Sequence, residues 1–225
     1  MHISTNASIT KSATPWPANA MPAGNVRVLE AHAPVFREGD AATHFYEVLD
    51  GAVRAVKIFP DGRRQIISFA FAGDIVGFGQ KENYGFDCDT LGAARIRAIP
   101  RSSLMRALRE QPELGEKLLE VAAGEVASMR DLSMLLCRKT ALERIASFLL
   151  SMAARGKGPV TGVRLPLPMG RADIADYLGL TIETVSRNLT KLRSLAIIDL
   201  PGRGGFVVRD LARLQLLAEC EENLH

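Results

Sequence analysis

The segment from 170 to 193 constrains the fold of this chain more than any other stretch. Its pattern predicts a short amphipathic helix, a tight turn at Gly179, and a second helix that begins just after Thr181. The apolar residues of the second helix fall on one stripe that can hold the helix on its domain: Ile182, Val185, Leu189 and Leu192. Two short helices joined by a tight turn are typical of the helix-turn-helix motif.

Three polar residues share a different face of the second predicted helix. Glu183, Ser186 and Arg187 stand at positions i, i+3 and i+4, so their side chains are neighbours. Arginine can bond guanine in a bidentate manner, glutamate can accept from cytosine, and serine can reach either kind of base edge. Because the helix-turn-helix motif places such residues in the major groove, the trio predicts sequence-specific binding to double-stranded DNA. A salt-bridged surface helix is the alternative interpretation.

The charge of the whole chain does not establish nucleic-acid binding, because the formal net charge is only +3. Local cations matter more, since they attract phosphates even on a nearly neutral protein. Such cations lie along the second predicted helix and upstream of the motif: Arg187, Lys191, Arg193, Arg138, Lys139 and Arg144. The predicted contacts to the DNA backbone are Thr181, Thr184, Lys191 and Arg203. Thr181 also suits the N-cap position.

Three scattered cysteines, Cys88, Cys137 and Cys220, provide neither a disulfide framework nor a pair with metal-ligand spacing. They are expected to be buried or incidental thiols in a reducing, cytoplasmic compartment, with a redox role for one of them as the alternative. The chain starts without the charged and apolar regions of a secretory signal, and no apolar run is long enough to span a bilayer. We therefore expect a cytoplasmic protein with no membrane partner and no bound metal.

The 225 residues are enough for two modest domains. Residues 1–24 are rich in Ala, Ser, Thr, Pro and Asn and are expected to form a mobile tail. Residues 25–112 predict an antiparallel β-roll, because short β-type runs alternate with turn signals. The runs are 45–49, 53–59, 65–71 and 94–99, and the turns are 50–51, 60–62 and 72–74.

Helical periodicity replaces the β pattern after the last of these runs. A short helix is predicted at 101–111, with Ser102 or Ser103 near its start, and a long helix is predicted at 113–137. Six residues of the long helix repeat at spacings of 4, 3, 4, 3 and 4, which is a coiled-coil seam: Leu118, Ala122, Glu125, Met129, Leu132 and Leu136. Such a helix can pack against its own β-domain or against a twin. Because a helix-turn-helix protein usually reads two half-sites, we expect this seam to form a homodimer, with Glu125 setting its register.

Residues 138–225 are expected to form a winged helix-turn-helix domain. Its first predicted helix, 140–154, turns an apolar face inward: Leu142, Ile145, Ala146, Leu149 and Leu150. The runs 197–200 and 205–208 predict a β-hairpin wing with Arg203 at its tip, and a final helix is expected at 210–222. The expected fold class is therefore α+β: an antiparallel β-roll, a long dimerisation helix and a C-terminal winged helix-turn-helix.

This layout, over residues 26–219, resembles the CRP/FNR superfamily of bacterial transcription regulators. The segment 180–187 is similar to the FNR branch, whose hallmark is Glu-x-x-Ser-Arg, whereas the cyclic-AMP receptor branch has Gly where Ser186 stands. The segment 72–78 is also similar to the FNR branch. The resemblance implies a palindrome with TTGA half-sites. It further implies that Arg187 reads guanine, Glu183 reads cytosine or adenine amino groups, and Ser186 reads thymine.

The chain departs from the sensing members of that superfamily. The oxygen-sensing members hold an iron–sulfur cluster on N-terminal cysteines and one in the roll, whereas the first 24 residues here contain no cysteine. A cluster needs about four thiolates. Cyclic-nucleotide binders have Gly-Glu and then an arginine against the phosphate, but this chain has Gly-Asp at 73–74 and two acids without arginine at 86–89. Haem needs ligands inside the roll, and His32 and His44 are more typical of a surface or turn.

What remains is the FixK-like branch, which resembles FNR in DNA reading but acts without a bound cofactor. The resemblance implies an activator of genes for microaerobic respiration or nitrogen fixation. It also implies RNA polymerase as a partner, through the loops at 60–63 and 155–162. The alternative is a ligand- or redox-gated regulator whose roll must bind an effector. We expect no enzyme and assign no catalytic, cofactor-binding or metal residue, because no nucleophile with a base, phosphate loop or metal cluster is evident.

Overall fold

The computed structural model describes residues 22–78, 82–155, 161–202 and 204–219. The chain divides into two compact units, with the boundary between Gly124 and Glu125. Residues 1–21 of the predicted tail lie outside the described residues. Among the helices that are described, none combines the length and the apolar character needed to cross a membrane.

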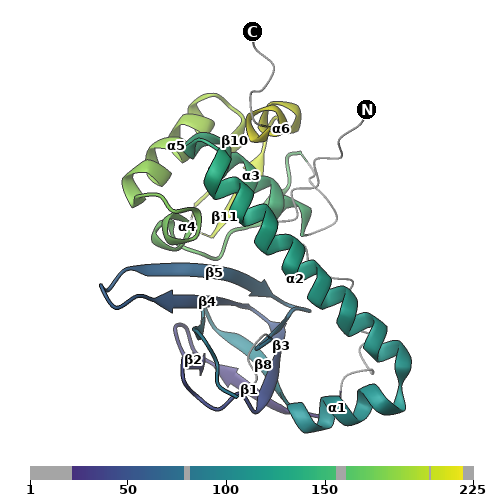
Figure 1. The fold of residues 1–225 in the computed structure, drawn as a ribbon. Coiled ribbons are helices and arrows are strands. Elements are labelled where there is room, and N and C mark those ends of the chain that lie inside the picture. Colours follow the sequence, from purple (N-terminus) through teal and green to yellow (C-terminus); the bar gives the residue numbers. More distant parts are fainter. Residues whose placement is uncertain (1–21, 79–81, 156–160, 203, 220–225) are drawn as a thin grey trace. The chain divides into compact units, whose positions relative to one another are not determined.

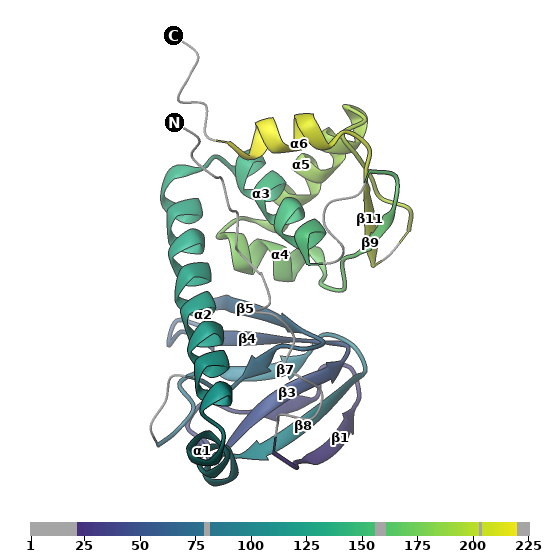
Figure 2. The ribbon, with the colours of Figure 1, turned by 90° about the vertical axis from the view of Figure 1, so that its right-hand side faces the viewer.

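The first unit contains two antiparallel sheets, and they confirm the predicted β-roll (Figures 1 and 2). One sheet has the strand order β1-β8-β3-β6 and the other the order β2-β7-β4-β5. The strands are β1 (Asn25–Leu29), β2 (Pro34–Phe36), β3 (His44–Asp50), β4 (Ala52–Ile58), β5 (Arg64–Phe71), β6 (Ile75–Val76), β7 (Asp87–Thr90) and β8 (Ala94–Pro100). The four predicted runs are confirmed as β3, β4, β5 and β8.

The other four strands were not predicted, and each has a physical reason. β2 and β6 contain three and two residues, which is too short for a hydrophobic period to show. β1 is largely exposed along its whole length, so it lacks the alternation of a half-buried strand. β7 has the sequence Asp-Cys-Asp-Thr, in which only the second and fourth residues are buried. Its two acids are residue types that are uncommon in strands, so the sequence did not indicate one.

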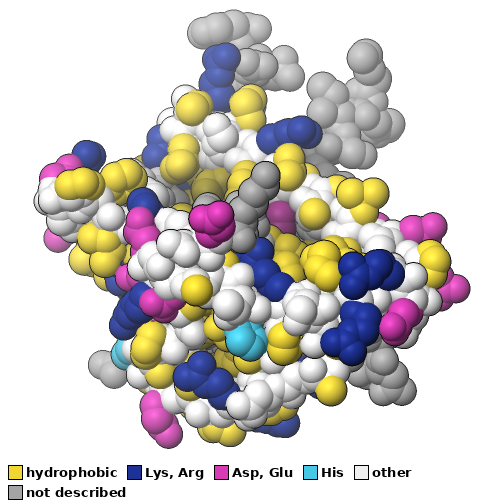
Figure 3. All heavy atoms as spheres, turned by 60° about the horizontal axis from the view of Figure 1, so that its bottom comes forward, with side chains coloured by type: hydrophobic (Ala, Val, Ile, Leu, Met, Phe, Trp, Pro, Cys, Tyr) yellow, Lys and Arg dark blue, Asp and Glu magenta, His cyan; other side chains and the backbone are white. Residues whose placement is uncertain are grey.

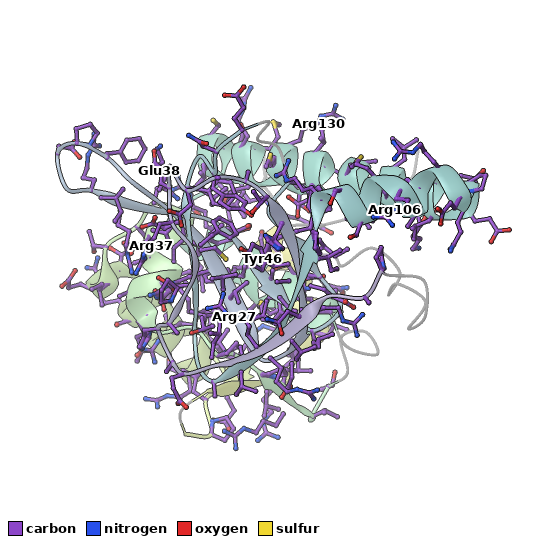
Figure 4. The ribbon with its side chains drawn as sticks, turned by 90° about the horizontal axis from the view of Figure 1, so that it is seen from below. Arg27, Arg37, Glu38, Tyr46, Arg106 and Arg130 are labelled. Atoms are coloured by element: carbon purple, nitrogen blue, oxygen red, sulfur yellow. The ribbon has the colours of Figure 1, made fainter. Side chains whose placement is uncertain are left out.

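Aromatic side chains fill much of the interior of the roll. Phe36 stacks on Tyr84 with ring centroids 3.9 Å apart, and its ring lies 5.5 Å from that of Tyr46. The Tyr84 hydroxyl donates a hydrogen bond to the main-chain oxygen of His44 at 2.7 Å. Figure 4 shows Tyr46 in the middle of the roll, where its ring is buried. Stacked rings of this kind stabilise a core beyond the area that they bury.

Two helices follow the roll. α1 (Arg101–Glu110) and α2 (Pro112–Arg138) confirm the two predicted helices. Ser102 and Ser103 lie in the first turn of α1, near its start as predicted, while the N-cap residue is Pro100 and no side chain caps the helix. Apolar residues from β3, β6, β8, α1 and α2 form one buried cluster: Phe45, Ile75, Ile99, Leu104 and Leu114. Leu118 and Val121 also pack against this cluster, so the first turns of α2 rest on the roll.

The second unit contains the end of α2 and a winged helix-turn-helix, which confirms the predicted fold class (Figure 1). Its further elements are α3 (Ala141–Ala154), β9 (Arg164–Pro166), α4 (Arg171–Leu178), α5 (Ile182–Ser194), β10 (Ile198–Asp199), β11 (Gly205–Val208) and α6 (Leu211–Ala218). β10 and β11 form the predicted wing hairpin, and β9 adds an unpredicted third strand. Of the predicted inward residues of α3, Leu142 and Leu150 are only half-buried.

Candidate nucleic-acid interface

The turn before α5 is fixed by a glycine and by a hydroxyl group. α4 ends at Gly179, which has a left-handed φ of 62°. Glycine adopts this conformation readily because it has no Cβ. The Oγ1 atom of Thr181 accepts a hydrogen bond from the Thr184 amide at 3.2 Å. The predicted turn and the predicted N-cap of α5 are therefore both confirmed.

The inner side of α5 holds the helix on its domain with three residues rather than the four predicted. Val185, Leu189 and Leu192 are at most 1% exposed. Ile182 is 49% exposed, so its predicted inward position is wrong. The reason is local: the chain from 181 to 183 is exposed throughout, and the first turn of α5 extends beyond the part of the helix that the core covers.

The outer side of α5 carries the predicted polar residues close together. Glu183 and Arg187 are exposed and Ser186 is half-buried. Nη2 of Arg187 lies 3.4 Å from Oγ1 of Thr184, to which it donates a hydrogen bond. A hydrogen bond from its own backbone N–H, another from the Thr181 side chain and the charge of Arg187 lower the pKa of Glu183 below its ordinary value. Glu183 is therefore an ionised hydrogen-bond acceptor near neutral pH.

The predicted cations separate into two groups. Arg187, Lys191 and Arg193 are exposed to solvent along α5. Lys139 and Arg144, in contrast, donate to groups inside the second unit. Arg144 donates to three main-chain oxygens, and Lys139 donates to the Ser147 hydroxyl at 2.8 Å. These two residues therefore do not belong with the predicted phosphate contacts. Arg138 is exposed, and Arg203 lies outside the described residues.

The acids at the position expected for a cyclic phosphate have arginine partners from elsewhere in the roll. Nε of Arg54, on β4, donates to Oδ1 of Asp89 at 2.7 Å. Nη1 of Arg37 lies 3.6 Å from Oδ2 of Asp87, and the Oδ1 atom of the same carboxylate accepts from the Glu38 amide at 2.8 Å. Figure 4 shows Arg37 and Glu38 toward the rim of the roll. The segment 86–89 lacks an arginine, but the fold supplies two cations to its carboxylates.

The described cysteines differ sharply in environment. Cys88 is completely buried in the core of the roll, and this burial, reinforced by the neighbouring Asp89 and Asp87, raises the pKa of its thiol. Cys137 is exposed near the end of α2. Within the described residues, no group of three or more His, Cys, Asp or Glu side chains is arranged to hold a metal ion. Cys220 lies outside the described residues.

Charged side chains are distributed in small groups on the face that Figure 3 shows. Basic and acidic groups alternate there with apolar ones among the described residues, in agreement with the small formal net charge of +3. With so small a net charge, attraction of an anionic polymer depends on local groups of cations rather than on the overall field. The exposed cations of α5 form one such group.

Known families match both halves of the chain. Residues 26–111 match the cyclic nucleotide-binding domain, and residues 143–217 match the Crp-like helix-turn-helix domain. The nitrogen fixation regulation protein FixK of Bradyrhizobium diazoefficiens is 42% identical over 192 residues, which cover 82% of this chain and 78% of that protein. The transcriptional activatory protein AadR of Rhodopseudomonas palustris is 39% identical over 188 residues, which cover 82% of this chain and 77% of that protein.

A solved structure shares the same architecture. The structure of FixK2 from Bradyrhizobium japonicum has a TM-score of 0.82 and 36% sequence identity with this chain. The match covers 88% of this chain and 98% of that one. The similarity therefore extends over the roll, the long helix and the winged helix-turn-helix together.

Proposed function

Because this chain belongs to the CRP/FNR family of DNA-binding transcription regulators, we propose that it is a FixK-like activator that binds DNA as a homodimer and without a bound cofactor. Its operator is a palindrome with TTGA half-sites, and its target genes serve nitrogen fixation or microaerobic respiration. The relatives named FixK are nitrogen fixation regulators, which supports this choice of genes. RNA polymerase is the further partner, and its contacts are the segments 60–63 and 155–162, of which residues 156–160 lie outside the described residues.

The exposed face of α5 carries the proposal. Arg187 reads guanine with two hydrogen bonds, Glu183 accepts from a cytosine or adenine amino group, and Ser186 contacts thymine. Support comes from the exposure of Glu183 and Arg187 on one side of a capped helix whose opposite side is buried. The hydroxyls of Thr181 and Thr184, with Lys191 and Arg203, contact phosphates.

Ile182 extends this reading face with an apolar contact. Its side chain is 49% exposed in the first turn of α5, directly before Glu183. Apolar side chains contact the methyl group of thymine in the major groove. A TTGA half-site presents thymines beside its guanine. Ile182 is therefore a base-reading residue that the sequence pattern assigned to the core.

The homodimer forms through α2, and exposure along this helix favours a particular register. Leu119, Val126 and Met129 are 71%, 48% and 55% exposed. With Ala122 they recur at spacings of 3, 4 and 3, as a coiled-coil seam requires. Leu118, a member of the predicted seam, packs on the roll instead. The proposed interface keeps three residues of the predicted seam: Ala122, Met129 and Leu136. Leu119 and Val126 take the places of Leu118 and Glu125. Leu132 lies at the edge of the interface.

We propose that the chain has four parts: a tail at 1–24, the β-roll at 25–112, the dimerisation helix at 113–137 and the DNA-binding domain at 138–225. The roll matches the cyclic nucleotide-binding domain, and one of its ion pairs, Arg54 with Asp89, lies largely buried within it. Arg54 is only 8% exposed, and its guanidinium donates a charge-assisted hydrogen bond to Asp89. Asp89 thus occupies the arginine in the way that an anionic ligand would. This internal pairing supports binding to DNA without an effector.

Sequence-specific binding tests this function. Fluorescence anisotropy compares purified protein on a labelled TTGA–TCAA palindrome and on the same duplex with scrambled half-sites. Specific regulators bind their sites about 10³-fold or more tightly than other DNA. Equal affinity for both duplexes would refute the proposed reading head. The match to a cyclic nucleotide-binding domain favours one alternative, an effector-gated regulator. Such a regulator would bind the palindrome only after an effector is added.

A further inference from the structure

Arg144 joins the ends of two helices through main-chain oxygens. Its Nη2 donates to the oxygen of Leu136 in the last turn of α2 at 2.8 Å, and its Nε donates to the oxygen of Lys139 at 2.9 Å. Its Nη1 donates to the oxygen of Leu178, the last residue of α4, at 3.0 Å. One planar guanidinium therefore bonds three carbonyls: one in α2, one in the link between α2 and α3, and one at the end of α4.

Two of these carbonyls, those of Leu136 in α2 and Leu178 in α4, are groups that helices leave without partners. The last carbonyls of a helix have no intrahelical donor and carry the negative end of the helix dipole. The Thr140 amide, the ordinary partner of the Leu136 oxygen, donates instead to the Glu143 carboxylate at 2.8 Å, which forms the capping box of α3. A cation that donates in three fixed directions satisfies them together, and lysine cannot do the same with its single ammonium group.

The joint lies next to the turn that sets the direction of α5. Gly179 follows Leu178 directly, and α5 begins three residues later at Ile182. A Cβ built on Gly179 would lie 3.6 Å from Cδ2 of Leu136 and 3.7 Å from Nη1 of Arg144, so the end of α2 and the guanidinium both contact this turn. The end of α2 and the turn of the helix-turn-helix are thus tied together at one point.

We infer that Arg144 is a positioning residue that fixes the direction of α5 relative to the end of α2 and thereby sets which half-site spacing the dimer accepts. The inference rests on the proposed function, because only a dimer on two half-sites senses their separation. Adding one base pair to the spacer moves one half-site by about 3.4 Å along the duplex and by about 35° around it. A rigid joint cannot follow this movement, whereas a loosened joint can.

The test compares three spacings of the palindrome: the preferred one and those with one base pair more or less. Wild type, Arg144→Lys, Arg144→Gln and Lys139→Met are measured by fluorescence anisotropy, after circular dichroism and thermal unfolding have shown which variants are folded. Arg144→Lys keeps the charge and the aliphatic stem. Lys139→Met is the matched control, because its side chain bonds Ser147 and the Ala218 oxygen rather than the turn before α5.

We expect wild type and Lys139→Met to lose about tenfold in affinity when the spacer changes by one base pair, the scale of one mismatched base pair. Arg144→Lys and Arg144→Gln should lose less than about threefold, with a salt dependence like that of wild type. A merely stabilising role would lower the unfolding temperature and leave the spacing preference intact, which overturns the inference. The inference is also overturned if Arg144→Lys keeps the spacing preference of wild type while Arg144→Gln has a flatter salt dependence. That result would make Arg144 a phosphate contact.

Two further results keep the inference separate from the proposed function. Wild type that fails to prefer any palindrome refutes the proposed function itself, whereas wild type that binds the palindrome at all spacings alike refutes only the role of Arg144. Hydrogen exchange in DNA-free protein provides a second measurement. The amides of residues 179–182 should exchange faster in Arg144→Lys and Arg144→Gln than in Lys139→Met, and equal exchange would contradict the inference without any DNA.

Discussion

Arg187 and Thr184 are joined across one turn of α5, with Nη2 of the arginine 3.4 Å from Oγ1 of the threonine. The amide of the same threonine donates to Oγ1 of Thr181, the N-cap residue. The residue proposed to read guanine is therefore held by the residues that begin its helix. Less side-chain freedom is lost on binding when a side chain is already ordered, which favours affinity.

Arg187→Ala should cost about 1–3 kcal/mol per half-site, because it removes a bidentate contact to guanine. The loss should be largest on the intact palindrome and small on operators whose guanine is already replaced. Competition binding against a set of single-base operator variants measures both effects. If the substitution weakens all sequences equally, Arg187 is a phosphate contact instead.

Lys191→Ala is the matched control for that experiment, since it removes the same charge from the same helix. We expect it to weaken all sequences alike and to reduce the slope of log affinity against log salt by about 1. Titrations at several salt concentrations give this slope. A loss confined to one base position would move Lys191 to the base-reading group.

Ile182→Ala should remove an apolar contact to the methyl group of thymine. Each buried methylene or methyl group contributes about 0.8 kcal/mol. An operator with uracil in place of the half-site thymines lacks that methyl group, so wild type should bind it more weakly while Ile182→Ala binds both operators nearly alike. Additive effects of the protein and DNA changes would show that Ile182 does not contact the methyl group.

Val126→Glu should convert the dimer into monomers at micromolar concentration, because it places a charge in the apolar seam of α2. Leu216→Glu is the control, since Leu216 is 68% exposed on α6 and lies outside the seam. Sedimentation velocity measures the state of both variants. A dimeric Val126→Glu protein, or a monomeric Leu216→Glu protein, contradicts the proposed interface.

Iodoacetamide should label Cys137 in the native protein and leave Cys88 unmodified. Burial and two nearby carboxylates raise the pKa of the Cys88 thiol, and the thiolate is the reactive form. Because folding favours the neutral thiol, this residue contributes stability below its unfolded pKa of 9.0, and that contribution declines as pH rises further. Mass spectrometry of native and unfolded samples locates the label. Equal labelling of both cysteines in the native state would contradict the buried position.

The sequence predicted the elements with strong periods and missed what depends on packing. The runs that became β3, β4, β5 and β8 alternate clearly, and the helices carry apolar stripes or capping residues. Ile182 has the same chemical character and spacing as Val185, and only the extent of the core decides that one is exposed and the other buried. Its place directly after the N-cap was the available signal.

Arg144 shows a second limit of sequence patterns. Its charge resembles that of the α5 cations, but its three partners are main-chain oxygens at positions 136, 139 and 178, and no side-chain pattern marks them. The pairing of Arg54 with Asp89 is similar, because it joins strands that are distant in the sequence but adjacent in the sheet. Such contacts follow from topology rather than from local spacing.

Binding of the purified, ligand-free protein to the palindrome in air tests cofactor-free regulation most directly. We predict tight, sequence-specific binding that does not change when cyclic nucleotides, a reductant or haem are added. Arg187→Ala should abolish this binding at the same protein concentration. Binding that appears only after one of these additions would contradict a cofactor-free regulator and would assign the roll an effector.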